Sequence, residues 1–146
     1  MHTDEKALFG RALEARKRSY SPYSGFSVGA ALLTESGKVY TGCNIECASY
    51  PATNCAERTA FWKAVSEGER AFSAIAVAGG KTGEPAAELC PPCGICRQVM
   101  AEFCGPDFRI VLGAEAGEIR VFTLGQLLPQ AFGPGMLQGG NHRENV

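Results

Sequence analysis

The sequence predicts an α/β protein, a three-layer α/β/α sandwich built on a mixed five-stranded sheet. Segments with helical and strand periodicity follow one another in the order α-β-β-α-β-α-β-β, and such chains bury a sheet between layers of helices. A length of 146 residues suits one domain with one core, and no internal repeat or domain boundary is visible. We expect a single domain over residues 1–137 and a flexible tail over residues 138–146, which are polar and glycine-rich.

The N-terminal part of the chain predicts one helix followed by two paired strands. The helix begins near Thr3-Asp4-Glu5, and small or apolar residues then recur at helical spacing, at Ala7, Leu8, Ala12 and Ala15. Residues 21–25 are rich in turn formers and follow the end of the helix. Alternating apolar residues predict a strand over 26–32, and Ser36-Gly37 turns the chain into a second strand over 38–44.

The rest of the chain predicts six more elements separated by loops. They are a helix over 54–67, a strand over 72–78, a helix over 93–103, strands over 108–112 and 119–123, and a short helix over 124–128. Gly68 ends the first of these helices, because glycine readily adopts the left-handed conformation common after a helix. The strand over 72–78 is almost wholly apolar, which is typical of a central strand buried on both faces.

Composition and charge exclude several classes of protein. The formal net charge is −1, and the densest basic group, residues 16–18, fits a helix end better than a nucleic-acid patch. The sequence has no long apolar run and no basic-then-apolar start, so we expect neither a membrane span nor an export signal. Without export, the 7 cysteines are expected to be reduced thiols, some of them metal ligands. We therefore expect a cytoplasmic protein that binds neither nucleic acid nor membrane.

Three cysteines and one glutamate predict a metal site that holds a reactive water. Cys55 falls at the start of the predicted second helix, and Cys93 and Cys96 share a face at the start of the third. Helix N-termini favour thiolates, and a catalytic zinc takes three protein ligands plus water. Glu57 is the candidate acid/base, and we expect Arg58 to offset the thiolate charge by hydrogen bonding to ligand sulfurs.

The residues alone leave alternatives to this interpretation. Cys93-x-x-Cys96 could be a redox pair, and Glu57 follows Asn54 at the spacing of a capping box. Cys90 could complete a closed four-thiolate zinc site, although the two prolines that follow hold the chain extended and argue against it. A zinc site could also serve a non-catalytic interaction module.

Four segments of the chain together resemble the small, zinc-dependent, tetrameric cytidine deaminases that act on free nucleosides. The likeness extends from the first predicted helix to Leu137. The segments are Asn44-Ile45-Glu46, Asn54-Cys55-Ala56-Glu57-Arg58-Thr59-Ala60, Pro92-Cys93-Gly94-Ile95-Cys96-Arg97-Gln98-Val99 and Leu127-Leu128-Pro129-Gln130-Ala131-Phe132-Gly133-Pro134.

The resemblance implies a hydrolytic deaminase with one zinc ion per subunit. Zinc would bind Cys55, Cys93 and Cys96, with Glu57 moving the protons. The implied reaction converts cytidine and 2′-deoxycytidine to uridine and 2′-deoxyuridine with release of ammonia, in pyrimidine salvage. The alternative within this chemistry is deamination of a related cytosine nucleoside, such as a nucleoside antibiotic.

The resemblance also assigns the substrate contacts and the oligomer. Asn44 and Glu46 would grip the ribose hydroxyls, and Glu46 would repel a phosphate. Further substrate contacts would come from Phe26, Ala56 and, from a neighbouring subunit, Phe132, while Tyr50 would lie near the subunit interface. The expected assembly is a homotetramer with shared active sites. From pattern alone, a strand-end turn at Asn44 and Glu46, an ordinary core position for Phe26 and a plug of its own core for Phe132 are the alternatives.

Overall fold

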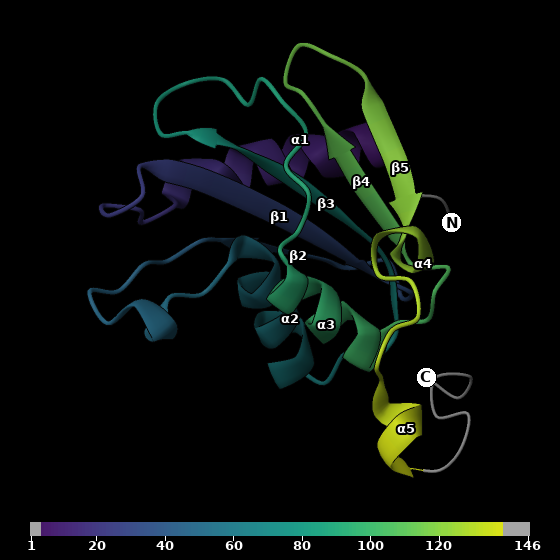
Figure 1. Cartoon of the computed structure of the whole chain (residues 1–146). Helices are drawn as coiled ribbons and strands as arrows, with labels where there is room; N and C mark the ends of the chain where they lie inside the picture. Colours follow the sequence, from purple (N-terminus) through teal and green to yellow (C-terminus); the bar gives the residue numbers. More distant parts are fainter. Residues whose placement is uncertain (1–3, 139–146) are drawn as a thin grey trace.

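The structure is a computed structural model that describes residues 4–138, and Figure 1 shows its sheet with helices on both faces. Its elements in chain order are α1 (Glu5–Ala15), the 3-10 turn η1 (Arg16–Arg18), β1 (Phe26–Thr34), β2 (Val39–Cys43), the 3-10 turn η2 (Tyr50–Ala52), α2 (Ala56–Ser66), β3 (Phe72–Lys81), α3 (Gly94–Phe103), β4 (Arg109–Gly113), β5 (Ile119–Thr123), α4 (Leu124–Leu127) and α5 (Pro134–Gln138).

The strands form one sheet in the order β2-β1-β3-β4-β5. The pair β3–β4 is parallel, and the other three pairs are antiparallel. In the middle of the sheet Ala30 of β1 lies between Gly42 of β2 and Val77 of β3. The predicted three-layer α/β/α fold with a mixed five-stranded sheet is confirmed.

Both faces of the sheet are covered, which gives the molecule two cores. One core packs α2 and α3 against the sheet around the buried ring of Phe61, and the other packs α1 against the opposite face through Leu8 and Phe9. Successive residues of β1 alternate between them, with Leu32 in the first core and Leu33 in the second. The larger apolar residues that predicted β1 face one core, and the smaller residues between them are also buried, beneath α1. The alternation in the sequence therefore reflects residue size more than exposure to solvent.

Two glycines allow helices to approach the sheet at backbone distance. A Cβ on Gly29 would lie 2.1 Å from the Ala12 carbonyl oxygen of α1. A Cβ on Gly42 would lie 2.6 Å from both the Ala56 carbonyl oxygen and the Ala60 amide nitrogen of α2. These separations are far below van der Waals contact, so only glycine fits. Gly42 thus sets how closely the first turn of α2 approaches β2.

The boundaries of several elements differ from the predicted ones. In α1, Ala7 is exposed and Phe9 is buried, so the apolar stripe is offset by part of a turn from the predicted one. The strand β3 continues to Lys81 because its last residues pair with the start of β1. The helix α2 begins at Ala56, two residues later than predicted.

The C-terminal region also differs from the prediction. No signal in the sequence predicts α5, whose last residue Gln138 falls within the predicted flexible tail. The remainder of that predicted tail, residues 139–146, lies outside the described residues, as does Thr3 of the predicted first helix start. No helix within residues 4–138 combines the length and the apolar character that crossing a membrane requires.

Candidate metal centre and active site

Two helix N-termini bring three cysteine sulfurs together. Cys55 is the N-cap residue of α2, Cys93 is the N-cap residue of α3, and Cys96 lies buried in the first turn of α3. The two helices cover the same face of the sheet (Figure 1). The three Sγ atoms all lie within 4.8 Å of one another. Because a helix N-terminus carries partial positive charge, the two helix starts favour negative charge at the place where the sulfurs meet.

The spacing of the sulfurs fits a zinc ion. Zinc–sulfur bonds of about 2.3 Å in a tetrahedral arrangement place two sulfurs about 3.8 Å apart. The Sγ atoms of Cys55 and Cys93 are 3.7 Å apart. Hydrogen bonds from the Cys96 thiol and from the Arg58 guanidinium lower the pKa of Cys55 to about 5, so this sulfur is a thiolate at neutral pH. The donor set therefore suits a metal held by three cysteine sulfurs, of which Cys55 is already ionised.

Arg58 lies directly against this cluster. Its Nη2 donates a hydrogen bond of 3.3 Å to Cys55 Sγ, which is the type of contact expected from the sequence. Its Nε is buried, and among residues 4–138 it has no hydrogen-bond partner. A buried N–H group without an acceptor is costly unless negative charge lies nearby. The buried position of the Arg58 guanidinium is therefore favourable when the cysteine sulfur beside it is negatively charged.

Glu57 is buried within the first turn of α2, with only 4% of its surface exposed. Burial raises the pKa of Glu57 to about 7. The capping-box alternative is wrong, because the N-cap residue is Cys55 and makes no side-chain cap bond. Asn54 instead donates to the Thr59 hydroxyl. The neighbouring Ala56 is fully buried as the first residue of the helix.

Cys90 does not join the sulfur cluster formed within the described part of the chain. Its sulfur packs against Gly79 of β3, where an added Cβ would lie 2.6 Å from Cys90 Sγ. Burial raises the pKa of the Cys90 thiol to about 11, which keeps it protonated and a poor metal ligand at neutral pH. The ligand set therefore has three cysteines, as the open-site interpretation predicted, and the four-cysteine alternative is not supported.

Asn44, one of the two predicted sugar contacts, follows the end of β2 and is buried. Its Oδ1 accepts hydrogen bonds from the Val28 amide at 2.9 Å and from the Ser19 hydroxyl at 2.5 Å. Its Nδ2 donates to the Phe26 carbonyl at 2.8 Å. The amide group therefore ties β1 to the chain after β2, and one Nδ2 hydrogen is left for a ligand.

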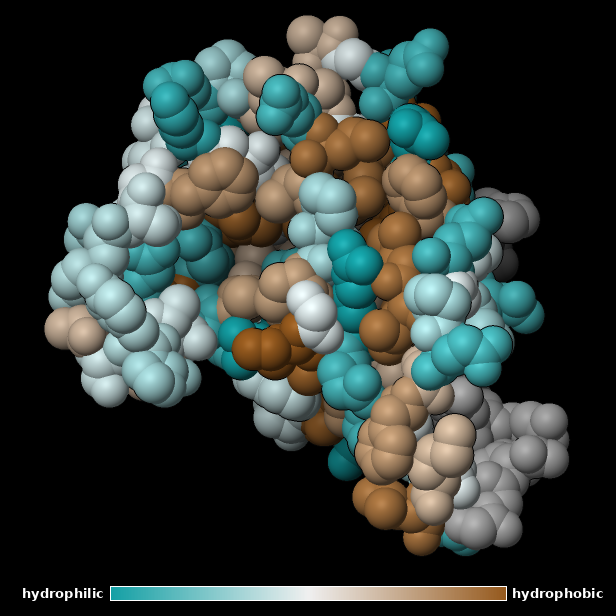
Figure 2. All heavy atoms as spheres, viewed as in Figure 1, coloured by the Kyte–Doolittle hydropathy of each residue, from teal (hydrophilic) through white to brown (hydrophobic). Residues whose placement is uncertain are grey.

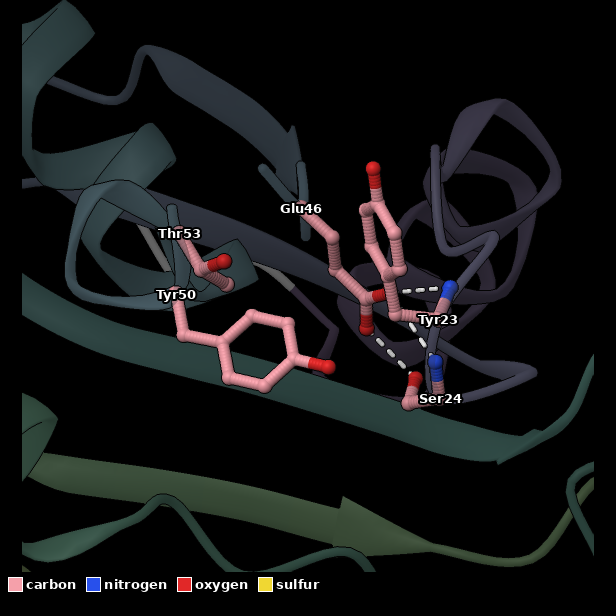
Figure 3. Close-up of a pocket in the computed structure, with 5 residues that line it drawn as sticks. All are labelled: Tyr23, Ser24, Glu46, Tyr50 and Thr53. Carbon is pink, nitrogen blue, oxygen red and sulfur yellow. Dashed lines mark hydrogen bonds between the residues drawn. The ribbon is translucent and has the colours of Figure 1, made fainter. Parts of the chain in front are cut away.

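Glu46, the other predicted sugar contact, lines a pocket of about 370 Å³. The other lining residues are Tyr23, Ser24, Tyr50 and Thr53. Figure 3 shows Glu46 and the Tyr23-Ser24 turn on one side of this pocket, with Tyr50 and Thr53 on the other. The Ser24 hydroxyl lies 2.5 Å from Glu46 Oε2 and lowers the pKa of Glu46. The pocket thus contains a carboxylate that stays ionised at neutral pH.

The predicted aromatic contacts are on the surface of the described chain. Phe26, at the start of β1, is 41% exposed, and Phe132 is 56% exposed. Neither is therefore a core residue, and the alternatives of a core strand position for Phe26 and an internal plug for Phe132 are wrong. Gln98 of α3 holds the Phe132 segment by donating a hydrogen bond of 2.7 Å to the Phe132 carbonyl. Tyr50 is also exposed and meets Tyr23 edge to face, with ring centroids 5.9 Å apart.

Sequence reasoning missed the residues that hold the predicted sugar contacts. Ser19 and Ser24 hydrogen bond to Asn44 and Glu46, and Thr53 lines the pocket. The only available signal was the serine-rich stretch 19–24, which was interpreted as a turn because serine is typical of turns.

Comparisons with known proteins agree with this site and fold. A family model described as the cytidine and deoxycytidylate deaminase zinc-binding region matches residues 2–113. A cytidine deaminase from Halalkalibacterium halodurans is 53% identical over 129 residues, which cover 88% of this chain and 94% of that protein. A cytidine deaminase from Sporosarcina psychrophila is 50% identical over 129 residues, which cover 88% of this chain and 91% of that protein.

A solved structure extends the agreement to the backbone. The crystal structure of cytidine deaminase from Burkholderia pseudomallei superposes with a TM-score of 0.80 at 49% identity, covering 89% of this chain and 100% of that chain. The matched family region includes every residue of the sulfur cluster and Glu57. The chain therefore belongs to the zinc-dependent cytidine deaminase family.

Proposed function

We propose that this protein hydrolyses free cytidine and 2′-deoxycytidine to the corresponding uracil nucleosides and ammonia, in pyrimidine salvage. The observation that carries the proposal is the buried Glu57, two residues after Cys55 in the helix start that brings the Cys55 sulfur within 4.8 Å of those of Cys93 and Cys96. Cys55, Cys93 and Cys96 would hold a zinc ion, which would act as a Lewis acid and lower the pKa of water from about 15.7 toward about 7.

Glu57 moves the protons of the reaction. Its carboxylate accepts a proton from the attacking water and delivers it to N3 of the cytosine ring while oxygen adds to C4. It then takes the proton of the new C4 hydroxyl and delivers it to the exocyclic amino group, so that the C4–N bond breaks, ammonia leaves and C4 becomes the carbonyl of uracil. A group whose pKa lies near the working pH can both accept and donate a proton, and burial places the pKa of Glu57 at about 7.

The sugar contacts favour a nucleoside over a nucleotide. The matched family includes deoxycytidylate deaminases as well as cytidine deaminases, so the sugar contacts must decide between these substrates. Glu46 is an ionised acceptor in its pocket, since hydrogen bonds from the Tyr23-Ser24 turn lower its pKa. A carboxylate there accepts a bond from a sugar hydroxyl and repels a phosphate. Asn44 offers its remaining Nδ2 hydrogen to the same sugar.

Exposed apolar and aromatic side chains support the proposal of a homotetramer with shared active sites. Apolar side chains gather over α5 (Figure 2), where Met136 and Leu137 are exposed close to Phe132 in the sequence. A tetramer would bury them, with Phe132 reaching the base in a neighbouring active site and Tyr50 near the interface. The cysteines of residues 4–138 form no disulfide with one another, an arrangement that fits the cytoplasm, where thiols are kept reduced.

Ammonia release, measured together with zinc content on the same sample, tests the proposed function. We expect one zinc per chain and turnover of cytidine and 2′-deoxycytidine, with much slower turnover of cytidine 5′-monophosphate. A zinc-loaded protein that is inactive on both nucleosides would refute the proposal. A preference for the monophosphate would refute the role given to Glu46, and a preference for a modified cytosine nucleoside would favour the alternative substrate.

A further inference from the structure

The Tyr23-Ser24 turn surrounds the Glu46 carboxylate with hydrogen-bond donors. Glu46 Oε1 accepts from the Tyr23 amide at 3.0 Å and from the Ser24 amide at 3.1 Å. Glu46 Oε2 accepts from the Ser24 hydroxyl at 2.5 Å. Figure 3 shows these three bonds converging on the carboxylate from one side of the pocket.

The number of acceptor sites limits what Glu46 can still bind. A carboxylate has about four acceptor sites, two on each oxygen. Three protein donors occupy both sites on Oε1 and one on Oε2. One acceptor site on Oε2 is left, so Glu46 is arranged to accept a hydrogen bond from one further hydroxyl.

The Ser24 hydroxyl also connects this carboxylate to the start of β1. Its oxygen accepts a hydrogen bond of 3.0 Å from the Phe26 amide while its proton goes to Glu46 Oε2. A single hydroxyl thereby fixes the carboxylate relative to the backbone that carries the exposed Phe26 ring. Ser24 lies in a turn at the surface and contributes nothing to either core, so its bonds serve the pocket.

We propose that Ser24 is a specificity-determining positioning residue, which orients Glu46 so that its one open acceptor site receives a sugar hydroxyl. The inference rests on the proposed nucleoside function. Ser24 acts through Glu46 and does not touch the reacting atoms. The hydrogen bonds that hold the carboxylate also lower the pKa of Glu46, which keeps it ionised as an acceptor.

The test is a mutational cycle of Ser24→Ala and Glu46→Ala on the zinc-loaded full chain. With cytidine, we expect Ser24→Ala to raise KM about 10-fold and to change kcat less than about 2-fold, as for loss of a hydrogen bond to a charged group. In the Glu46→Ala background, adding Ser24→Ala should change neither constant. Equal losses in both backgrounds, or a loss confined to kcat, would overturn the proposal.

A second substrate and two further variants make the result independent of folding defects. With 2′,3′-dideoxycytidine, which lacks the ring hydroxyls, the effect of Ser24→Ala should shrink to under about 2-fold. Ser24→Thr keeps a hydroxyl and should restore KM for cytidine. The matched control is Ser36→Ala, which removes a hydroxyl bonded to Thr34 Oγ1 at 2.9 Å in the β1–β2 turn and should leave both constants unchanged.

Measurements on the wild-type protein distinguish a failure of the role of Ser24 from a failure of the proposed function. If the wild type releases ammonia from cytidine and Ser24→Ala has the same kinetic constants, only the role of Ser24 is overturned. A wild type that releases no ammonia from either cytosine nucleoside would refute the proposed function itself.

Discussion

The metal side and the proposed sugar side of the candidate site are built in different ways. On the metal side, Cys55, Glu57, Cys93 and Cys96 stand at the starts of two helices that are packed on a core. On the sugar side, Asn44 and Glu46 follow a strand end and are held by bonds to the segment 19–26. Helix starts fix side chains by residue spacing, whereas the sugar side depends on backbone amides and serine hydroxyls from another part of the chain.

The two sides should control different kinetic constants, kcat on the metal side and KM on the sugar side. In the proposed function the metal side would hold the zinc and the proton carrier, so its loss should remove turnover. The sugar side would supply hydrogen bonds to a part of the substrate that does not react, so its loss should weaken binding. Interactions that are equal in the ground state and the transition state change KM, and those made only in the transition state change kcat.

The largest expected effect is from Cys96→Ser, because it removes a buried ligand from a three-ligand site. Serine is a poor zinc ligand at neutral pH, so zinc content and turnover should both be lost. Metal analysis of the purified protein and ammonia release measure the two quantities. Cys90→Ser is the control and should keep its zinc; loss of zinc in Cys90→Ser would restore the four-cysteine site.

Gly42→Ala tests the close contact between β2, which leads to the sugar side, and α2, which begins on the metal side. An added Cβ would meet the backbone of α2 at 2.6 Å, so either β2 or the first turn of α2 must move. We expect a loss of about 1–3 kcal/mol in the free energy of unfolding, together with reduced turnover. Thermal unfolding measures the first quantity.

Gly10→Ala in α1 is the matched control for that change, because a Cβ there meets nothing within 4 Å. It should stabilise the protein by up to about 1 kcal/mol, since alanine favours a helix interior more than glycine does. If the Gly42→Ala protein were as stable and as active as the Gly10→Ala protein, the close approach of α2 to β2 would not be required for stability or turnover.

Glu46→Gln should act on binding alone. Glutamine keeps the shape of the side chain but loses the charge, so KM for cytidine should rise about 10-fold while zinc content and kcat stay close to wild type. Discrimination against cytidine 5′-monophosphate should fall. In the wild type, KM should stay constant as the pH falls from neutral into the mildly acidic range, because hydrogen bonds from Ser24 and Tyr23 hold the pKa of Glu46 below its ordinary value. A Glu46→Gln protein that loses turnover at unchanged KM would contradict the division between the sides.

Gln98→Ala should have the smallest effect. It removes the hydrogen bond of 2.7 Å to the Phe132 carbonyl and leaves the metal ligands in place. Loss of one neutral hydrogen bond at an exposed position should lower kcat/KM about 5-fold at unchanged zinc content. Phe132→Ala should cost more, and an active monomer of either variant would contradict the shared active site.

The sequence was most informative where spacing along a helix determines position. The helix starts near Cys55 and Cys93 and the succession of helices and strands along the chain follow from local periodicity, and the structure places the three sulfurs together as expected. The open metal site was also predictable, because Pro91 and Pro92 hold Cys90 away from the helix face. The start of α2 was missed by two residues, which is why capping and catalysis by Glu57 could not be separated from sequence alone.

The sequence was least informative where position depends on contacts between distant segments. The bonds from Ser19 and Ser24 to Asn44 and Glu46 span 25 and 22 residues, and nothing in local composition specifies them. The composition of residues 19–24 predicts a turn, and it does so whether or not the hydroxyl and amide groups of that turn donate hydrogen bonds to pocket residues. The short helix α5 has no clear signal in the sequence because it is only five residues long and begins with Pro134-Gly135.

The central claim is that Glu57 carries the protons while the thiolates hold the metal. It is tested most directly by Glu57→Gln, with zinc content, cytidine affinity and ammonia release measured on one sample. We predict full zinc occupancy, retained binding of cytidine and a fall in kcat of about 10²–10⁴-fold, the usual contribution of a positioned acid/base. Near-normal turnover at full zinc occupancy would contradict the account.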